Sequence, residues 1–462
     1  MASTKTRLGI SAWAVTVFVL AFGSNGVRSL VGWPGFLGIT AVVFVVSVAL
    51  LVKHRPPRFK WYRVPKPLFA FLFLATASLL WSAYRLETAL GVLAQLVTTG
   101  IAVAVATVLS WSEILRTLGT ALRWLLVLSY AFELYVSVFV REPLLQGFVT
   151  VPDADKTPKL LFWSRNLLFE GGPIQGVVAN SALLGFLGLL ALIVFSVQLA
   201  SGAVGKFYGS AWILVAAVTL LLTRAATVWV ALFVVLVSLG FALWTRRVGD
   251  NRKPVYIVGL AGLAAAGAVG IWGRDWVFGL LGKSRDLTGR VEIWQKVTAL
   301  AAERPWFGWG WISHWAPWVE PFQSLDRKAG LQVMHAHNAW LDVWLQLGWV
   351  GLAIFVTLAL MTLQRVWCRA VDAPRRGAEP PLPYAASTLF PWLVMCALMV
   401  QSLTESRLLV EWGWLLFVVF AVKTRIDYEL PSRADEPPRI PWRHVPIPRE
   451  DRSRRQQQLH VE

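Results

Sequence analysis

LTGRVEIWQKVTALAAERPWFGWGWISHWAPWVEPFQSLDRKAGLQVMHAHNAWLDVWLQLGWVGLAIFV occupies residues 287–356 and decides how the rest of the chain is interpreted. It is the longest amphipathic stretch in a chain that is otherwise mostly apolar. It holds an arginine at a predicted helix start, a tryptophan-rich turn, and His-Ala-His-Asn directly before an apolar helix. These features predict a segment outside the membrane that covers a chemical site.

The composition around this stretch is that of a membrane protein. Hydrophobic residues make up 56% of the 462 residues and charged residues only 15%. The apolar residues come in runs of roughly 15 to 25, and about 20 helical residues span the hydrocarbon core of a bilayer. The sequence therefore predicts an all-α polytopic membrane protein rather than several soluble domains.

The formal charge of +18 raises the question of a nucleic-acid partner. The basic residues lie in short loops between apolar runs and in the C-terminal tail, where they set topology and attract anionic lipid. No module that reads RNA or DNA is present, so we expect no nucleic-acid partner. The two cysteines, Cys368 and Cys396, predict neither a disulfide framework nor thiol catalysis.

We predict about twelve transmembrane spans, with a large extracytoplasmic helical loop between the ninth and the tenth. An apolar run follows Lys5 and Arg7 without a clear cleavage site, so the first span is expected to be retained. Halves related by an internal repeat, as in many transporters, are not evident. The expected spans are residues 8–22, 30–52, 66–83, 88–109, 117–140, 174–199, 207–222, 226–244, 255–272, 338–363, 386–404 and 408–422.

The distribution of Lys and Arg orients these spans. With both termini in the cytoplasm, the basic residues concentrate in the inner loops and in the tail. Residues 1–422 then form one transmembrane bundle that includes outer loops 141–173 and 273–337. The basic, Pro- and Arg-rich tail 423–462 lacks apolar periodicity and is expected to be disordered or to lie on the inner leaflet. The orientation places these residues on the outer side: Arg224, Arg290, His314, His335, His337 and Glu405.

The large loop has its own predicted elements. Thr288 can cap a helix that begins near Gly289 and ends at Pro305. The apolar face of this helix would carry Val291, Trp294, Val297, Leu300 and Ala301. A tight aromatic turn follows, and a second amphipathic piece is predicted at 322–332, before His335-Ala336-His337-Asn338 meets the tenth span.

Two arginines are candidates for binding an anion. Arg224 lies between two apolar spans with almost no loop, and either snorkels to phosphate headgroups or holds a substrate phosphate through its planar, bidentate donors. Arg290 lies in the first turn of the loop helix, where the helix dipole favours anions. It either binds such an anion or forms a surface ion pair with Asp286 or Glu292.

His337 is the candidate proton acceptor, because a neutral imidazole has an ordinary pKa of about 6.5 and can deprotonate a hydroxyl. The alternative is a surface histidine that only forms hydrogen bonds. A metal site would need a third donor beside His335 and His337, and His314 is the candidate, but no recognisable ligand spacing is present. We expect no metal and no cofactor.

Other residues have open roles. The aromatic run 306–318 either lies on the bilayer or stacks against sugars and lipid. Arg165, Glu170, Asn180 and Glu405 are candidates for the rim of the site. Three acidic residues are expected within the membrane, where ionisable groups are usually functional, but their partners cannot be named: Glu133, Asp342 and Glu411.

The order of these motifs resembles the O-antigen ligase / O-antigen polymerase superfamily. The resemblance covers about residues 165–420, and its specific part is 287–351. It departs from the family where Thr223 replaces a common Ser before Arg224, and where Ala179-Asn180 replaces Pro-Asn, which weakens a role for Asn180. The motifs are Arg224 between spans, Thr288-Gly289-Arg290-x-x-x-Trp294, Pro305-Trp306-Phe307-Gly308-Trp309-Gly310, His335-x-His337-Asn338-x-Trp340-Leu341 and Leu347-Gly348-x-x-Gly351.

The resemblance implies a GT-C-like, metal-independent, inverting glycosyltransferase of the cytoplasmic membrane with an extracytoplasmic active site. Its donor would be a glycan on undecaprenyl or decaprenyl diphosphate, and its acceptor a glycan or lipid-linked glycan. His337 would activate the acceptor hydroxyl, while Arg224 and Arg290 would hold the donor diphosphate. Ligase and polymerase differ in acceptor and not in chemistry, so the sequence does not separate them.

Two other functions compete with this one. Tryptophan-rich outer loops flanked by histidines occur in haem-handling membrane proteins, although the run 309–318 lacks the acidic residue usual there. The span count alone would also fit a flippase or a solute transporter. The transferase hypothesis makes a geometric demand that the others do not: both arginines and His337 should line one cavity.

Overall fold

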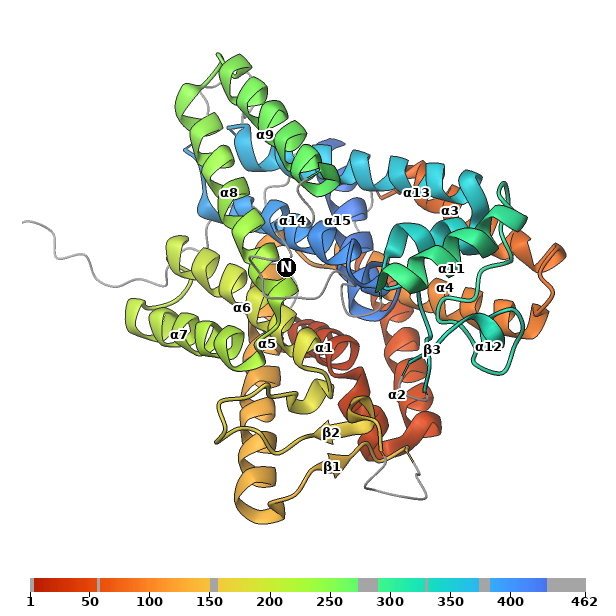
Figure 1. Cartoon of the computed structure of the whole chain (residues 1–462). Coiled ribbons are helices and arrows are strands. Elements are labelled where there is room, and N and C mark those ends of the chain that lie inside the picture. The colour runs from red at the N-terminus through yellow and green to blue at the C-terminus, as the bar shows by residue number, and fades with distance from the viewer. Residues whose placement is uncertain are drawn as a thin grey trace, which may run out of the picture. The chain divides into compact units, whose positions relative to one another are not determined.

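A computed structural model describes residues 4–55, 59–149, 157–272, 290–328, 331–373 and 383–429 (Figure 1). All of them belong to one compact unit. The predicted cap Thr288, the adjoining Gly289 and the tail from residue 430 lie outside the described residues, so the predictions made for them stay predictions.

The described chain is mostly helical, as the composition predicts (Figure 1). The α-helices are α1 (Thr4–Phe22), α2 (Ser24–His54), α3 (Lys66–Ala77), α4 (Arg85–Val108), α5 (Trp111–Tyr135), α6 (Ser181–Ala200), α7 (Lys206–Thr223), α8 (Ala226–Val248), α9 (Lys253–Trp272), α11 (Arg290–Glu303), α12 (Phe322–Leu325), α13 (Ala339–Val371), α14 (Phe390–Ser402) and α15 (Glu411–Glu429).

Short elements connect these helices. Two small antiparallel pairs, β1 with β2 and β3 with β4, lie in the two long loops. The strands are β1 (Leu144–Leu145), β2 (Phe162–Ser164), β3 (Arg327–Lys328) and β4 (Leu331–Gln332). The single-turn helices are η1 (Trp61–Arg63), η2 (Ser78–Leu80), the π-helical η3 (Val136–Val140), η4 (Lys159–Leu161), η5 (Gly176–Val178), η7 (Ala386–Leu389) and η8 (Ser406–Leu409).

The chain is a multi-pass membrane protein. Among the described residues, eight helices are long and apolar enough to cross a membrane: Thr4–Phe22, Ser24–His54, Arg85–Val108, Trp111–Val140, Ser181–Ala200, Lys206–Thr223, Ala226–Val248 and Ala339–Val371. Three shorter apolar helices add to them, at Lys66–Leu80, Lys253–Ala265 and Ala386–Ser402. The count of twelve spans and their orientation stay predictions.

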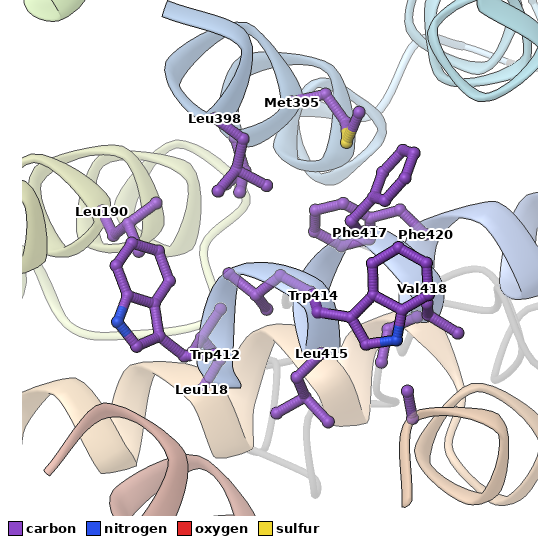
Figure 2. Close-up of a cluster of buried hydrophobic side chains, with 14 of the residues drawn as sticks. Leu118, Leu190, Met395, Leu398, Trp412, Trp414, Leu415, Phe417, Val418 and Phe420 are labelled. Atoms are coloured by element: carbon purple, nitrogen blue, oxygen red, sulfur yellow. The ribbon is translucent and has the colours of Figure 1, made fainter. Parts of the chain in front are cut away.

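The core of the bundle forms around residues 412–422 of α15, a segment that is apolar on all sides. Trp414, Phe417 and Phe420 of this helix are completely buried. Figure 2 shows them among side chains of α14, α6 and α5, including Leu398 and Leu190. A helix without a polar face is stable only when neighbours surround it. The predicted twelfth span is therefore a central helix, and it continues beyond the expected end at residue 422 to Glu429.

The first long loop is fastened to the bundle by a buried carboxylate. Glu133 of α5 accepts hydrogen bonds from the backbone N–H groups of Gln175 and Gly176 at 2.8 and 2.7 Å, and from the Ser164 hydroxyl at 2.7 Å. Ionised carboxylates bound by several donors are strong anchors. The structure thus gives Glu133 the partners that the sequence could not name, and they are those of a structural residue.

Asn180, a rim candidate from the sequence, is a helix cap. Its side-chain oxygen accepts hydrogen bonds from the backbone N–H groups of Ala182 and Leu183 at 2.9 and 3.1 Å. Such a cap satisfies donors that the first helical turn leaves without partners. It also explains why α6 begins at Ser181, several residues after the predicted start of the sixth span at residue 174.

The predicted tenth span is broken. Gly348 interrupts α13 with φ 65° and ψ −168°, so residues 339–347 form a first arm and residues 349–371 a second arm. Trp340 of the first arm lies against Phe355 of the second, with 5.1 Å between the ring centroids. The backbone conformation at Gly348 is one that residues with a Cβ rarely adopt. The glycine therefore permits the sharp bend.

Candidate active site

The His335-Ala336-His337-Asn338 turn is held at both of its ends. Asn338 caps α13, because its side-chain oxygen accepts hydrogen bonds from the backbone N–H groups of Trp340 and Leu341 at 3.0 and 3.2 Å. His337 has a left-handed backbone, with φ 49°, and its N–H donates to Nδ1 of His335 at 3.1 Å. The asparagine of the motif thus shapes the turn that presents His337.

Two further contacts fix the turn at Ala336. The indole N–H of Trp294, in α11, donates to the Ala336 carbonyl at 2.9 Å. The Ala336 N–H donates to Oδ2 of Asp342 at 3.1 Å, and the same oxygen accepts the Ser406 hydroxyl. Asp342 is completely buried. It therefore joins the histidine turn to the segment after α14, and this is the partner set that the sequence left open.

Glu405 is the centre of a charged cluster. Its Oε1 receives a hydrogen bond from Nη2 of Arg290 at 2.9 Å, and its Oε2 lies 3.2 Å from Nδ1 of His337. His335 Nε2 is 3.9 Å from the same Oε2. The four side chains are between 17% and 26% exposed, so the cluster is largely removed from solvent yet reachable. The structure thus brings two predicted site residues, Arg290 and His337, onto one carboxylate.

The electrostatics of the cluster define its protonation. Burial alone would raise the pKa of Glu405, but the hydrogen bond and charge of His337, together with the Arg290 guanidinium, lower that pKa to about 2. Burial and the neighbouring His337 lower the pKa of His335 well below its ordinary value. At neutral pH, Glu405 is therefore an anion and His335 a neutral imidazole.

This arrangement suits His337 for accepting a proton. A carboxylate at Nδ1 favours the tautomer in which Nδ1 carries the hydrogen and Nε2 is free. The same carboxylate stabilises the imidazolium that forms once Nε2 takes a proton. The His337–Glu405 pair thus has the geometry of a general base held in orientation by an acid residue.

A second charged centre lies beyond His335. Glu411 forms ion pairs with Arg28 of α2 at 3.1 Å and with Arg407 at 2.7 Å. Arg28 is stacked over Trp33, 4.7 Å from the ring centroid. These contacts give Glu411 the partners that the sequence could not supply, and they tie α2 to the start of α15.

His314 lies between the two charged centres. Its ring centroid is 6.2 Å from that of His335. Burial, with a further contribution from the positive charge of Arg407, lowers the pKa of His314 to about 4. This histidine is therefore neutral at physiological pH.

Arg224 lies apart from this cluster. It ends α7 in a left-handed conformation, with φ 48°, and its side chain is exposed. Its Nη2 is 3.1 Å from the position that a Cβ on Gly171 would take. Within the described chain, no hydrogen bond or ion pair joins Arg224 to Arg290, Glu405 or His337.

A small hollow lies beside Glu405. It is lined by Thr227 and Val228 at the start of α8, by Ala182 and Leu183 of α6, and by Glu405, but not by Arg224. The structure therefore brings Arg290 and His337 together on Glu405, and it does not show both arginines and His337 lining one cavity.

The Pro-Trp-Phe-Gly-Trp-Gly and Leu-Gly-x-x-Gly motifs pair with each other through the backbone. The N–H groups of Trp309 and Gly310 donate to the carbonyls of Leu345 and Gln346 at 3.0 and 2.9 Å, and the Trp349 N–H donates to Pro305 at 2.8 Å. A Cβ on Gly348 would be 2.2 Å from the carbonyl carbon of residue 306. The glycines are therefore required for close backbone contact.

The aromatic run after this joint divides between core and surface. Trp311 and Trp315 are at most 1% exposed and belong to the core, whereas Trp306 and Trp318 are 66% and 68% exposed. Buried Gln346 holds the run in place, since its Oε1 accepts hydrogen bonds from the N–H groups of Ile312 and Ser313. Neither sequence interpretation, a bilayer-lying surface or a sugar-stacking one, describes the whole run.

The elements of the large loop differ in part from the prediction. Helix α11 ends at Glu303, as Pro305 indicates, and buries Val297 and Ala301, but its buried face also includes Ile293. The predicted amphipathic piece 322–332 contains the one-turn α12 and both strands of the β3–β4 pair. Arg290 forms an ion pair with distant Glu405 at 2.9 Å, and within the described residues it forms none with Glu292. Asp286, the other partner that the alternative named, lies outside the described residues.

A metal site is the main alternative for the cluster. Donor atoms of His335, His337 and Glu405 lie within 4.8 Å of one another, and two histidines with a carboxylate suit Zn²⁺. The third donor is thus Glu405, and not His314 as the sequence suggested. Arg290 already occupies Oε1 of Glu405, and its positive charge opposes a divalent cation there. The residues fit a base–carboxylate–guanidinium cluster better than a metal centre.

The fold and site together define a helical membrane protein with a charged, partly enclosed cluster beside its bundle. The model of the O-Antigen ligase family matches residues 209–356, which contain Arg224, Arg290 and His337. This part of the chain is thus similar to the family, and the resemblance to the O-antigen ligase / O-antigen polymerase superfamily is confirmed. None of the curated proteins matches the chain.

The match supports a cell-surface polysaccharide ligase or polymerase that acts on lipid-linked glycans in the membrane. Its matched range ends before Glu405, Ser406 and Arg407. A group of polar side chains directly after the eleventh predicted span was a weak signal for these residues, of which only Glu405 was named as a candidate for the rim.

Proposed function

We propose that the protein transfers a glycan from a polyprenyl-diphosphate donor to an acceptor hydroxyl at the outer face of the cytoplasmic membrane. The observation that carries the proposal is the contact of both Arg290 and His337 with Glu405. In the proposed reaction, this contact would keep a cation for the departing diphosphate beside a base for the incoming hydroxyl. The family match favours this function over haem handling and over transport.

The reaction is a single displacement with inversion. Nε2 of His337 accepts the proton of the acceptor hydroxyl, and the oxygen attacks the anomeric carbon of the donor sugar. The bond from that carbon to the diphosphate oxygen breaks, and its electron pair goes to that oxygen. The diphosphate leaves still attached to its polyprenyl chain. The products are the extended glycan and a polyprenyl diphosphate.

Arg290 contributes electrostatic stabilisation of the leaving group. A guanidinium carries five N–H donors in a fixed plane, so Arg290 can bind Glu405 with one and still offer others to the diphosphate. Arg224 is the second proposed diphosphate ligand. This role requires its exposed side chain to reach toward the hollow that Thr227 and Glu405 line.

A transfer assay with reconstituted full-length protein tests the function. The donor is a glycan on a polyprenyl diphosphate, and we expect transfer to an acceptor glycan to proceed in the presence of EDTA. His337→Ala should reduce the rate to background, and Arg290→Ala should reduce it strongly. Undiminished transfer by His337→Ala would overturn the mechanism, and loss of wild-type activity upon chelation would overturn its metal independence.

A further inference from the structure

An apolar groove runs between the second arm of α13 and the end of α14. It has a volume of about 310 Å³, and its lining side chains are apolar; among them are Trp340, Ala359, Leu360, Leu363, Met399 and Leu403. This volume is at the lower end of that of small-molecule sites, roughly 300–1,000 Å³. The groove is therefore large enough for part of an apolar chain and too small for a whole polyprenyl group.

One end of the groove adjoins the charged cluster. Leu403 lines the groove, its carbonyl accepts a 3.5 Å hydrogen bond from the Asn338 side chain, and it precedes Glu405 by two residues. Trp340 lines the groove three residues after His337, and its indole N–H donates to the Ser402 hydroxyl at 3.0 Å. A molecule with a charged head at Glu405 and Arg290 could thus continue directly into this groove.

The groove is open on one side. Leu360 and Leu403 are 60% and 53% exposed, although both are large and apolar. Residues 339–371 are among the helices apolar enough to cross a membrane. An open apolar side on such a helix is suited to face lipid, and the chain of a membrane-bound donor would enter from there.

We infer that this groove binds the part of the donor's polyprenyl chain next to the diphosphate. The inference rests on the proposed function, which supplies a ligand with an anionic head and a long apolar chain. Lipid tails are as apolar as leucine, so the groove gains little from the hydrophobic effect. What it provides is a fixed direction for the chain, which holds the diphosphate and the anomeric carbon in line with His337.

Photo-crosslinking tests the inference without requiring glycan transfer. The probe is a polyprenyl diphosphate with a diazirine on the isoprene unit next to the diphosphate, added to full-length protein in vesicles of phosphatidylglycerol and phosphatidylethanolamine. We expect crosslinks within residues 356–363 and 399–403. Unlabelled polyprenyl diphosphate should abolish them, and extra phosphatidylglycerol should not.

Two matched variants sharpen the test. Leu360→Trp fills the groove from its exposed side, and we expect it to lower crosslinking, and kcat/KM for the polyprenyl donor, by about tenfold. Leu214→Trp, at an equally exposed apolar position on α7, should leave both unchanged.

The outcomes separate this inference from the proposed function. Crosslinks that map elsewhere, or that phosphatidylglycerol displaces as well as polyprenyl diphosphate does, would show that the groove holds bulk lipid. A wild-type protein that shows the expected crosslinks but transfers no glycan would refute the proposed transfer and leave the groove assignment standing. Normal crosslinking by Leu360→Trp would overturn the assignment.

Discussion

Glu405→Gln removes the negative charge from between Arg290 and His337 while preserving the size of the side chain. Two unit charges at the 3.2 Å separation of Glu405 Oε2 and His337 Nδ1 attract by about 5 kcal/mol at an effective dielectric constant of about 20. The two side chains are 18% and 26% exposed, and glutamine retains a dipole, so about half of this attraction should be lost. We therefore expect kcat to fall roughly 100-fold.

The steady-state and pH behaviour of this variant distinguish orientation of the base from simple structural support. KM for the donor should not rise, because Arg290 loses a competing partner. The shape of the pH–rate profile should also change, a result that a merely structural loss would not produce. Glu405→Asp should recover part of the rate. These quantities are measured by initial-rate transfer assays on reconstituted protein between pH 4 and 8.

A matched control and a measurement of stability complete the experiment. Glu303→Gln changes the same functional group at an exposed position near the end of α11 and should leave the rate unchanged. Thermal unfolding in detergent establishes whether Glu405→Gln remains folded. A folded Glu405→Gln protein with kcat within about twofold of wild type would refute the assignment of Glu405 as the residue that orients His337.

Three further changes test the architecture. Gly348→Ala places a Cβ against the backbone of residues 306 and 307 and should destabilise the protein by more than about 3 kcal/mol in thermal unfolding. Gly240→Ala, a control with open space around it, should cost no stability. Equal effects of the two variants would contradict the backbone pairing of the two glycine motifs. Glu133→Gln should weaken the anchor of the first loop by about 2 kcal/mol, seen as faster proteolysis of that loop, and an unchanged rate would count against it. The pKa of His314 is lower in the folded state than in the unfolded state, where it is about 6.5. The stability that neutral His314 contributes is therefore fully present above about pH 6.5 and is lost as the pH falls toward 4. His314→Gln should remove up to about 3 kcal/mol of this pH dependence of the unfolding free energy, and an unchanged pH profile of stability would refute the assignment.

Much of the helical framework follows from the sequence, because long apolar runs leave few alternatives in a membrane. The ends of the helices follow less well. Asn180 delays the start of α6 by capping it, and α15 extends past residue 422 because Lys423 and Asp427 pair at 3.4 Å within the helix. The apolar pattern of a sequence predicts where a helix can form, whereas caps and side-chain pairs determine where the helix begins and ends.

The site was predictable only in part. Arg290 and His337 stand out through local motifs, and the structure brings them together. Their shared partner, Glu405, is 115 residues from Arg290 and 68 from His337, and no local pattern indicates which segments will meet across such separations. The glycine motifs were visible as patterns, but their role in backbone pairing depends on contacts between distant parts of the chain.

The bend at Gly348 brings residues that are far apart along α13 close together in space. In a straight helix, Trp340 and Ala359 would be about 29 Å apart along the axis, close to the full thickness of the hydrocarbon core. In the folded chain both line the same groove. The bend at one glycine thus brings together two residues that are nineteen positions apart. With the groove assigned to the donor chain, the two arms of one helix contact both the head and the chain of the same amphiphile. A substitution that straightens α13 should therefore uncouple binding of the donor's diphosphate from binding of its polyprenyl chain. It should do so even when the side chains that contact the diphosphate and the chain are unchanged.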